Sequence, residues 1–150
     1  MQESHTPSTP REARQAQVII LTALPLGVTL FALVGLWVTR EGVPGDPGPL
    51  LAVWGFATVA AVVAAFIVWQ RMVKPHLPVS GRRAEPPSME EIGRFQTGQI
   101  VAMALIEGVA LFGGVILIIA GRALPALVGV VMIWTALALL WPRRAWYGLR

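Results

Sequence analysis

A single carboxylate, Glu107, interrupts the apolar segment A102-M-A-L-I-E-G-V-A-L-F-G-G114. An ionised carboxylate is costly in hydrocarbon, so Glu107 is expected to be protonated, paired or turned toward a polar cleft. An acid in this setting can carry a proton or bind a cation. It can also be a neutral group that fixes helix packing through a hydrogen bond. Both interpretations remain open, and Glu107 is the candidate proton- or ion-binding residue.

Small residues surround Glu107 at helical spacing. Ala104, Ala110 and Gly114 lie at i−3, i+3 and i+7, and such a face lets two helices approach closely. We therefore expect Glu107 to be buried against another helix. If its role is structural, its hydrogen-bond partner is expected among five polar residues of the apolar runs: Thr22, Thr29, Thr58, Gln99 and Thr135.

Other chemistry has little support in the sequence. The chain has no cysteine, which excludes disulfides and thiolate chemistry. It contains no Gly-x-Ser-x-Gly, phosphate-binding loop or His-Glu-x-x-His motif. His5 and His76 have no second ligand at metal-binding spacing. We expect no catalytic residue, no cofactor and no metal site, and hence a non-enzymatic protein.

The element that carries Glu107 is one of four apolar runs. The chain has 150 residues, of which 55% are hydrophobic and 13% charged, which is typical of a membrane protein. Each run has about 20 residues, enough for a helix to cross a bilayer. The fold class is thus predicted as all-α and integral to the membrane, with four transmembrane helices. The runs are 18–38, 50–69, 100–120 and 123–141.

The basic residues predict the orientation of these helices. Ten of the twelve Lys and Arg residues lie in the N-terminal tail, the central loop and the C-terminal tail, and only Arg40 and Arg122 lie in the other connections. This bias predicts a multi-pass protein of the cytoplasmic (inner) membrane with both termini in the cytoplasm. The basic residues lie between apolar runs, so we expect the lipid bilayer, and no nucleic acid, as a partner.

The chain divides into five segments. Ser88 and Glu91 have capping-box spacing, so the third helix should begin before it enters the membrane. Gly121-Arg122 is too short to separate its neighbours, which makes the third and fourth helices antiparallel. The aromatic and basic segment 141–150 is expected to lie along the inner membrane surface. The segments are a polar N-terminal tail (1–17), a first transmembrane hairpin (18–72), a cytoplasmic linker with the start of helix three (73–97), a second transmembrane hairpin (98–142) and a basic C-terminal tail (143–150).

The two hairpins contain an internal repeat. Residues 19–36 align with 100–117 at a separation of 81, and nine of the 18 columns are identical. This similarity predicts duplicated hairpins whose first helices run parallel and lie side by side. Leu26 occupies the column of Glu107, so only one copy carries the acid.

The segment E91-I-G-R-F-Q-T-G-Q-I-V-A-M-A-L-I-E-G-V-A-L-F-G-G-V resembles the second helix of the proteolipid, or c subunit, of rotary ATP synthases. That family has an A-L-x-E-x-x-A-L-[YF]-G core around its ion-carrying carboxylate. The resemblance implies that Glu107 matches this carboxylate, and that Ala104, Ala110 and Gly114 match the small residues around it. The whole chain resembles a small bacterial four-helix membrane protein.

Two functions are therefore predicted. The first is a small non-enzymatic membrane protein whose helix packing is organised around Glu107, and which forms a homo-oligomer or joins a larger membrane complex. The alternative, implied by the resemblance, is a proton- or sodium-handling component of a membrane complex. A polar group facing Glu107 from another helix would favour the alternative.

Overall fold

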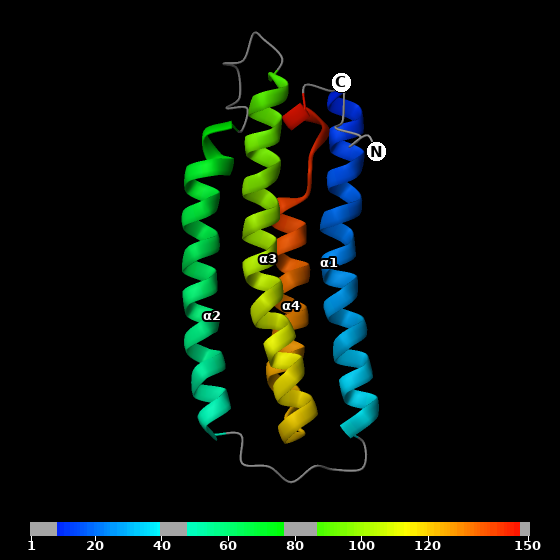
Figure 1. Cartoon of the computed structure of the whole chain (residues 1–150), viewed down its shortest axis with the longest axis vertical. Coiled ribbons are helices and arrows are strands. Elements are labelled where there is room, and N and C mark those ends of the chain that lie inside the picture. The colour runs from blue at the N-terminus through cyan, green and yellow to red at the C-terminus, as the bar shows by residue number, and fades with distance from the viewer. Residues whose placement is uncertain (1–8, 40–47, 77–86, 148–150) are drawn as a thin grey trace, which may run out of the picture.

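The computed structural model describes residues 9–39, 48–76 and 87–147, which are helical apart from short connections (Figure 1). Four long helices dominate: α1 (Pro10–Val38), α2 (Gly48–Val68), α3 (Met89–Ala120) and α4 (Ala123–Leu140). A π-helical segment, η2 (Trp69–Val73), and a 3₁₀ turn, η3 (Lys74–His76), continue α2. A 3₁₀ turn, η4 (Arg144–Tyr147), follows α4.

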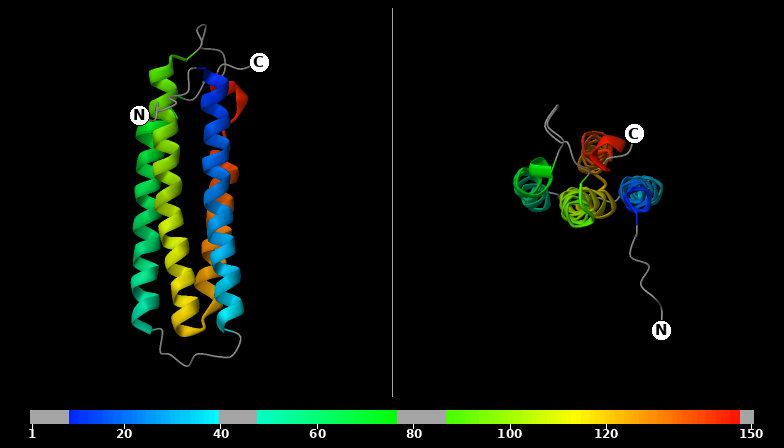
Figure 2. Two further views of the ribbon diagram at one scale, coloured as in Figure 1. Left: turned by 45° about the vertical axis from the view of Figure 1, so that its right-hand side comes forward. Right: turned by 90° about the horizontal axis from the view of Figure 1, so that it is seen from above.

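The four long helices form a bundle in which α3 is central. The start of α1, the end of α2, the start of α3 and η4 all lie at one end, which we call the terminal end (Figure 1). Viewed from that end, α1 and α2 lie on opposite sides of the α3–α4 pair (Figure 2). α3 consequently packs against each of the other three helices.

All four long helices are long and apolar enough to cross a membrane, which indicates a multi-pass membrane protein. The exposure of large apolar side chains agrees, since Phe56 is 79% exposed, Leu139 73% and Ile19 70%. Such a surface is suited to lipid and would be unusual in water.

Side-chain caps explain where α1 and α3 begin. The Ser88 hydroxyl accepts from the Glu91 N–H, and the Glu91 carboxylate accepts from the Ser88 N–H, which confirms the predicted capping box. α1 begins at Pro10, eight residues before the predicted apolar run. Thr9 caps it by accepting from the Glu12 N–H at 3.3 Å, and proline is favoured at the first helical position.

The predicted antiparallel pairing of α3 with α4 is confirmed. α3 ends at Ala120 and is capped by Gly121, whose φ of 66° gives the left-handed conformation that glycine adopts without strain. Beyond this turn the two helices come very close. A Cβ added at Gly113 would lie 2.6 Å from the Pro125 oxygen, and one at Gly129 would lie 2.7 Å from the Ala110 Cα.

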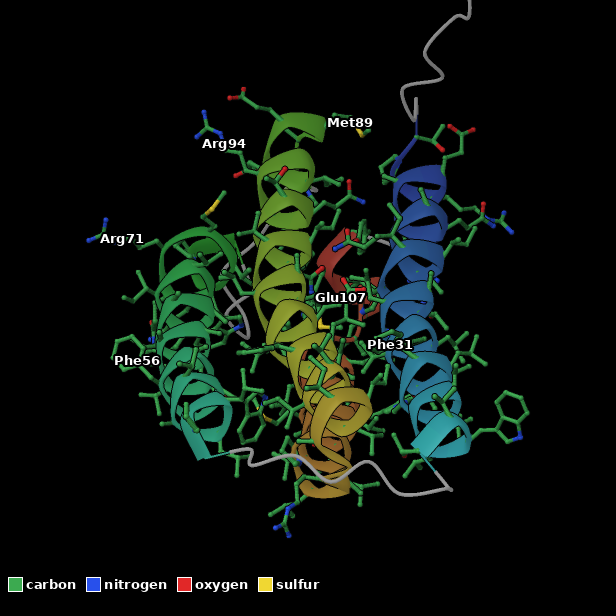
Figure 3. The ribbon with its side chains drawn as sticks, turned by 60° about the horizontal axis from the view of Figure 1, so that its bottom comes forward. Phe31, Phe56, Arg71, Met89, Arg94 and Glu107 are labelled. Carbon is green, nitrogen blue, oxygen red and sulfur yellow. The ribbon has the colours of Figure 1, made fainter. Side chains whose placement is uncertain are left out.

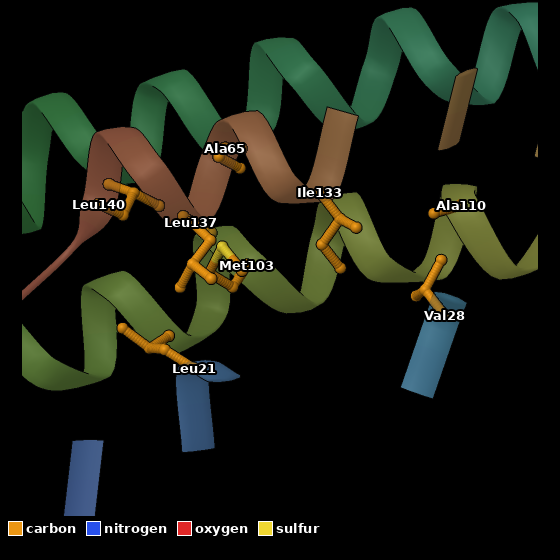
Figure 4. Close-up of a cluster of buried hydrophobic side chains, with 10 residues drawn as sticks. Leu21, Val28, Ala65, Met103, Ala110, Ile133, Leu137 and Leu140 are labelled. Carbon is orange, nitrogen blue, oxygen red and sulfur yellow. The ribbon is translucent and has the colours of Figure 1, made fainter. Parts of the chain in front are cut away.

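The core lies along this α3–α4 contact and is completed by α1 and α2. Buried Leu21 and Val28 from α1 meet Met103 and Ala110 of α3 and Ile133 of α4 (Figure 4). Ala65 reaches the same cluster from α2. One continuous apolar core therefore connects all four helices.

The two predicted hairpins are packed differently. α3 and α4 have the most extensive contact in the bundle, whereas α1 and α2 are separated by that pair. The first helices of the hairpins do run parallel and side by side, as predicted. The duplication itself stays a prediction, and the Gly/Pro-rich connection at 40–47 and the proline-rich part of the linker at 77–86 lie outside the described residues.

Candidate functional site

The contacts between α1 and α3 define the depth of Glu107. Gln17 bonds to Gln99, and Gly35 lies against Leu117, so residues that face each other are 82 apart in sequence. Phe31 and Gly114 give a separation of 83. Glu107 therefore lies at the level of Leu24 and Pro25 of α1, about 20 Å from the end of α3 at Ala120.

Glu107 lies on the edge of α3 that faces α1. Gly114, two turns further along, touches the Phe31 ring, and Figure 3 shows Glu107 and Phe31 in the same region between the two helices. The Glu107 side chain is partly exposed. No hydrogen bond or ion pair joins it to any residue in the described part of the chain. The burial expected from the sequence is thus reached only in part.

The three small residues around Glu107 face different neighbours. Ala110 packs against Gly129 of α4, and Gly114 packs against Phe31 of α1. Ala104 is exposed. Gly108, which follows Glu107 directly, is also exposed, and a Cβ added there would meet no atom within 4 Å. Ala104 and Gly108 are four residues apart, so the carboxylate borders an exposed surface of small residues.

The threonines named as candidate partners of Glu107 bond within their own helices. Each hydroxyl donates to the carbonyl four residues earlier, at 2.7 Å for Thr22, Thr29 and Thr58 and at 2.8 Å for Thr135. Thr29 also accepts from the Trp134 indole at 3.0 Å, which joins α1 to α4. The structure therefore does not bring these hydroxyls to the carboxylate.

Gln99, the fifth candidate partner, belongs to a second polar site at the terminal end. It is fully buried, accepts from the Gln17 amide and donates to the Leu140 carbonyl at 2.7 Å. The Tyr147 hydroxyl donates to Gln17 Oε1 at 2.7 Å. We call Gln17, Gln99 and Tyr147 the terminal cluster. All of its polar atoms have partners within the chain.

Tyr147 closes this cluster, although the sequence predicted a segment lying along the membrane surface. The side chain is 1% exposed and packs edge-on to Phe95, with Ala13 and Val73 in the same apolar cluster. Burial raises the pKa of the Tyr147 phenol to about 12. The Arg14 guanidinium, which donates to the Pro142 carbonyl at 3.1 Å, ties the preceding turn to α1.

Sequence reasoning missed the terminal cluster because Gln17 was assigned to the polar tail and Tyr147 to an interfacial segment. One signal was present: T9-P-R-E12 combines a capping threonine with proline and glutamate at the favoured positions. A helix that starts there places Gln17 inside the bundle. Tyr147 left no comparable signal, since aromatic residues are also typical of membrane interfaces.

The structure contains no assembled metal site in its described ranges, where no three His, Asp or Glu side chains come together. Glu107 is the only acid of α3 beyond its first turn, and the terminal cluster consists of two amides and a phenol that is neutral near pH 7. Comparisons with protein-family models, with curated proteins and with solved structures find no significant match for the chain.

Proposed function

We propose that the chain is a non-enzymatic protein of the cytoplasmic membrane that associates with a second copy of itself through the α3 face around Glu107. The observation that carries this proposal is a partly exposed carboxyl group, beside the exposed Ala104 and Gly108, that has no partner among the described residues. A polar group facing lipid is costly, so an interface that covers it is favourable.

A second copy suits this face because its chemistry is self-complementary. A protonated carboxyl group has one O–H donor and one carbonyl acceptor, so two Glu107 side chains related by a twofold axis can satisfy each other. All copies cross the membrane in one direction, so their α3 helices would run parallel. Small residues four apart are typical of closely packed parallel transmembrane pairs.

Oligomeric state tests this proposal in the full-length protein reconstituted at low density in lipid nanodiscs or vesicles. Gly108→Leu places a bulky group on the proposed contact, and Glu107→Leu removes the polar pair. The second change should weaken the dimer by roughly three- to thirtyfold, the range expected for a hydrogen bond between membrane helices. Gly108→Leu should weaken it at least as much.

Gly55→Leu is the matched control, because Gly55 lies on α2 and a Cβ there also meets no atom within 4 Å. It should leave the dimer unchanged. A Gly108→Leu protein that dimerises as well as Gly55→Leu would rule out this face. Glu107→Gln should retain part of the affinity, since two amides can also pair.

The proton- or sodium-handling alternative is supported by the proteolipid-like segment, while the described part of the chain offers Glu107 no polar partner from another helix. Carbodiimide labelling separates the two functions. Labelling of Glu107 that falls when sodium is added, with ion uptake lost in Glu107→Gln, would support ion handling. Labelling that is insensitive to sodium would leave the assembly role.

The orientation is part of the same proposal: both termini face the cytoplasm. Single cysteines at Ser4, Ser80 and Asp46, positions outside the described residues, provide the test because the chain has no native cysteine. An impermeant thiol reagent should label position 46 in intact cells and spare positions 4 and 80. Labelling of positions 4 and 80 but not of position 46 would show that the orientation is the reverse of the one proposed.

A further inference from the structure

A groove with a volume of about 400 Å³ lies between α2, α3 and α4, away from the Glu107 face. Its wall is formed by Ala65 of α2, Trp69 of η2, Ala102 and Ile106 of α3, and Leu140 of α4. These side chains are apolar apart from the Trp69 indole N–H. An apolar groove of this kind has no affinity for a polar solute or an ion.

The groove opens toward the outer surface of the bundle. Val62 and Leu139, on its two rims, are 45% and 73% exposed. Because all four helices are suited to a membrane, this outer surface faces lipid. A molecule can therefore enter the groove sideways from the bilayer.

The length and lining of the groove suit a hydrocarbon chain. Its lining residues run from Val62 of α2 to Trp69 at the start of η2, or roughly 10 Å along the helix axis. A single flexible hydrocarbon chain fits along this direction, and burial against an apolar wall is favourable for it.

Positive charge lies just beyond the groove at the terminal end. Arg71 and Lys74 follow Trp69 by two and five residues, or roughly 3 to 8 Å along the helix. Both side chains are exposed, and neither has an ion-pair partner in the structure as described. Figure 3 shows Arg71 extending from this end of the bundle. An acyl chain in the groove would place its phosphate near this pair of cations.

We propose that the groove binds one acyl chain of an anionic phospholipid whose headgroup lies beside Arg71 and Lys74. The Trp69 side chain, stacked on Phe66 with ring centroids 6.3 Å apart, forms the boundary between the chain and the headgroup. Indoles are typical of this depth because one edge is apolar and the other can donate a hydrogen bond.

Native mass spectrometry of the full-length protein in detergent, titrated with phosphatidylglycerol or with phosphatidylcholine of the same acyl chains, tests the proposal. The wild type should bind one phosphatidylglycerol in preference to phosphatidylcholine by roughly tenfold to thirtyfold, since each nearby cation contributes a factor of about five. Removing both cations with Arg71→Gln and Lys74→Gln should abolish this preference. Arg11→Gln, at an exposed position on α1, is the charge control.

Val62→Trp should fill the groove and reduce binding of both lipids at least tenfold. Val63→Trp is its matched control, because Val63 is 52% exposed, adjacent in sequence and not part of the groove. Leu139→Trp blocks the groove from α4 and provides a second variant if the first does not fold. Three results would each overturn the proposal. The first is equal lipid binding by Val62→Trp and Val63→Trp, and the second is wild-type binding without headgroup preference. The third is a Val62→Trp protein that changes its oligomeric state but still binds lipid as the wild type does.

Discussion

The terminal cluster and Glu107 are two places where polar side chains enter the apolar bundle, and their hydrogen bonding differs. Gln17, Gln99 and Tyr147 come from three separate elements and form hydrogen bonds with one another. Gln17, Gln99 and Tyr147 are no more than 1% exposed. Glu107 is partly exposed, and no residue in the described part of the chain bonds to it.

In the terminal cluster, every polar side-chain atom has a hydrogen-bond partner within the chain, whereas Glu107 has none among the described residues. The terminal cluster joins α1, α3 and the segment after α4, so its hydrogen bonds stabilise the fold. Glu107 makes no such connection to the residues that the structure describes. Placing an acid in an apolar helix is costly, and the contact with a second copy proposed above would offset that cost.

The largest expected loss of stability comes from a substitution that breaks the hydrogen bonds of the terminal cluster. Gln99→Leu leaves the Gln17 amide and the Leu140 carbonyl without partners, which should reduce the free energy of unfolding by about 2–4 kcal/mol. Unfolding in mixed micelles measures this change. Gln15→Leu, at an exposed position on α1, is the control and should have little effect. Equal stability of the two variants would show that the cluster contributes nothing.

Two glycines of α3 show the same contrast, because Gly113 is packed against α4 whereas Gly108 lies on an exposed surface. Gly113→Ala places a Cβ 2.6 Å from the Pro125 oxygen, a backbone atom that cannot move aside, and should destabilise the monomer by about 1–3 kcal/mol. Gly108→Ala meets no atom and should be neutral or slightly stabilising. Thermal unfolding of both variants in detergent gives the comparison, and reversed effects would contradict the packing of α3 on α4.

A smaller effect should come from the Tyr147 hydroxyl. Tyr147→Phe keeps the aromatic packing but loses the bond to Gln17, at a cost of about 1 kcal/mol. The folded pKa of about 12 lies above the usual value of 10.0, so the neutral phenol stabilises the fold fully below pH 10. That contribution should be lost as the pH rises from 10 to 12. Stability measured across this range should show the loss in the wild type and not in Tyr147→Phe.

The smallest expected effect on monomer stability comes from replacing Glu107. In monomeric detergent conditions, Glu107→Leu should change the free energy of unfolding by no more than about 0.5 kcal/mol, because the side chain makes no bond within the described chain. Gln99→Leu in the same detergent is the reference. A loss above 2 kcal/mol from Glu107→Leu would mean that the acid stabilises the monomer after all.

Local signals in the sequence predicted much of this fold. The ends of the apolar runs at Val38 and Ala120, the Ser88 capping box and the turn at Gly121 all depend on neighbouring residues, and the structure confirms them. The side-by-side arrangement of α1 and α3 followed from the repeat. By contrast, Gln17 and Gln99 are 82 residues apart, and their pairing depends on tertiary packing that no local pattern contains.

For the candidate site, the sequence identified the unusual residue but could not determine its surroundings. Glu107 stands out in the sequence because all of its neighbours from Ala102 to Gly114 are apolar residues or glycine. Whether an i+3 or i−3 neighbour faces protein or lipid depends on where α1 and α4 lie, so Ala110 is buried and Ala104 is exposed. The groove between α2, α3 and α4 could not be predicted from the sequence either, because residues from separate helices form it.

The position of α3 between α1 and α2 also has a consequence for the order in which the protein is made. A ribosome delivers α1 and α2 to the membrane first, yet these two helices have no extensive contact with each other. They must remain as independent spans until α3 arrives and supplies a surface for both. We therefore expect assembly of the bundle to begin once the third helix is present, so that the first half of the chain gains its tertiary stability during synthesis of the second.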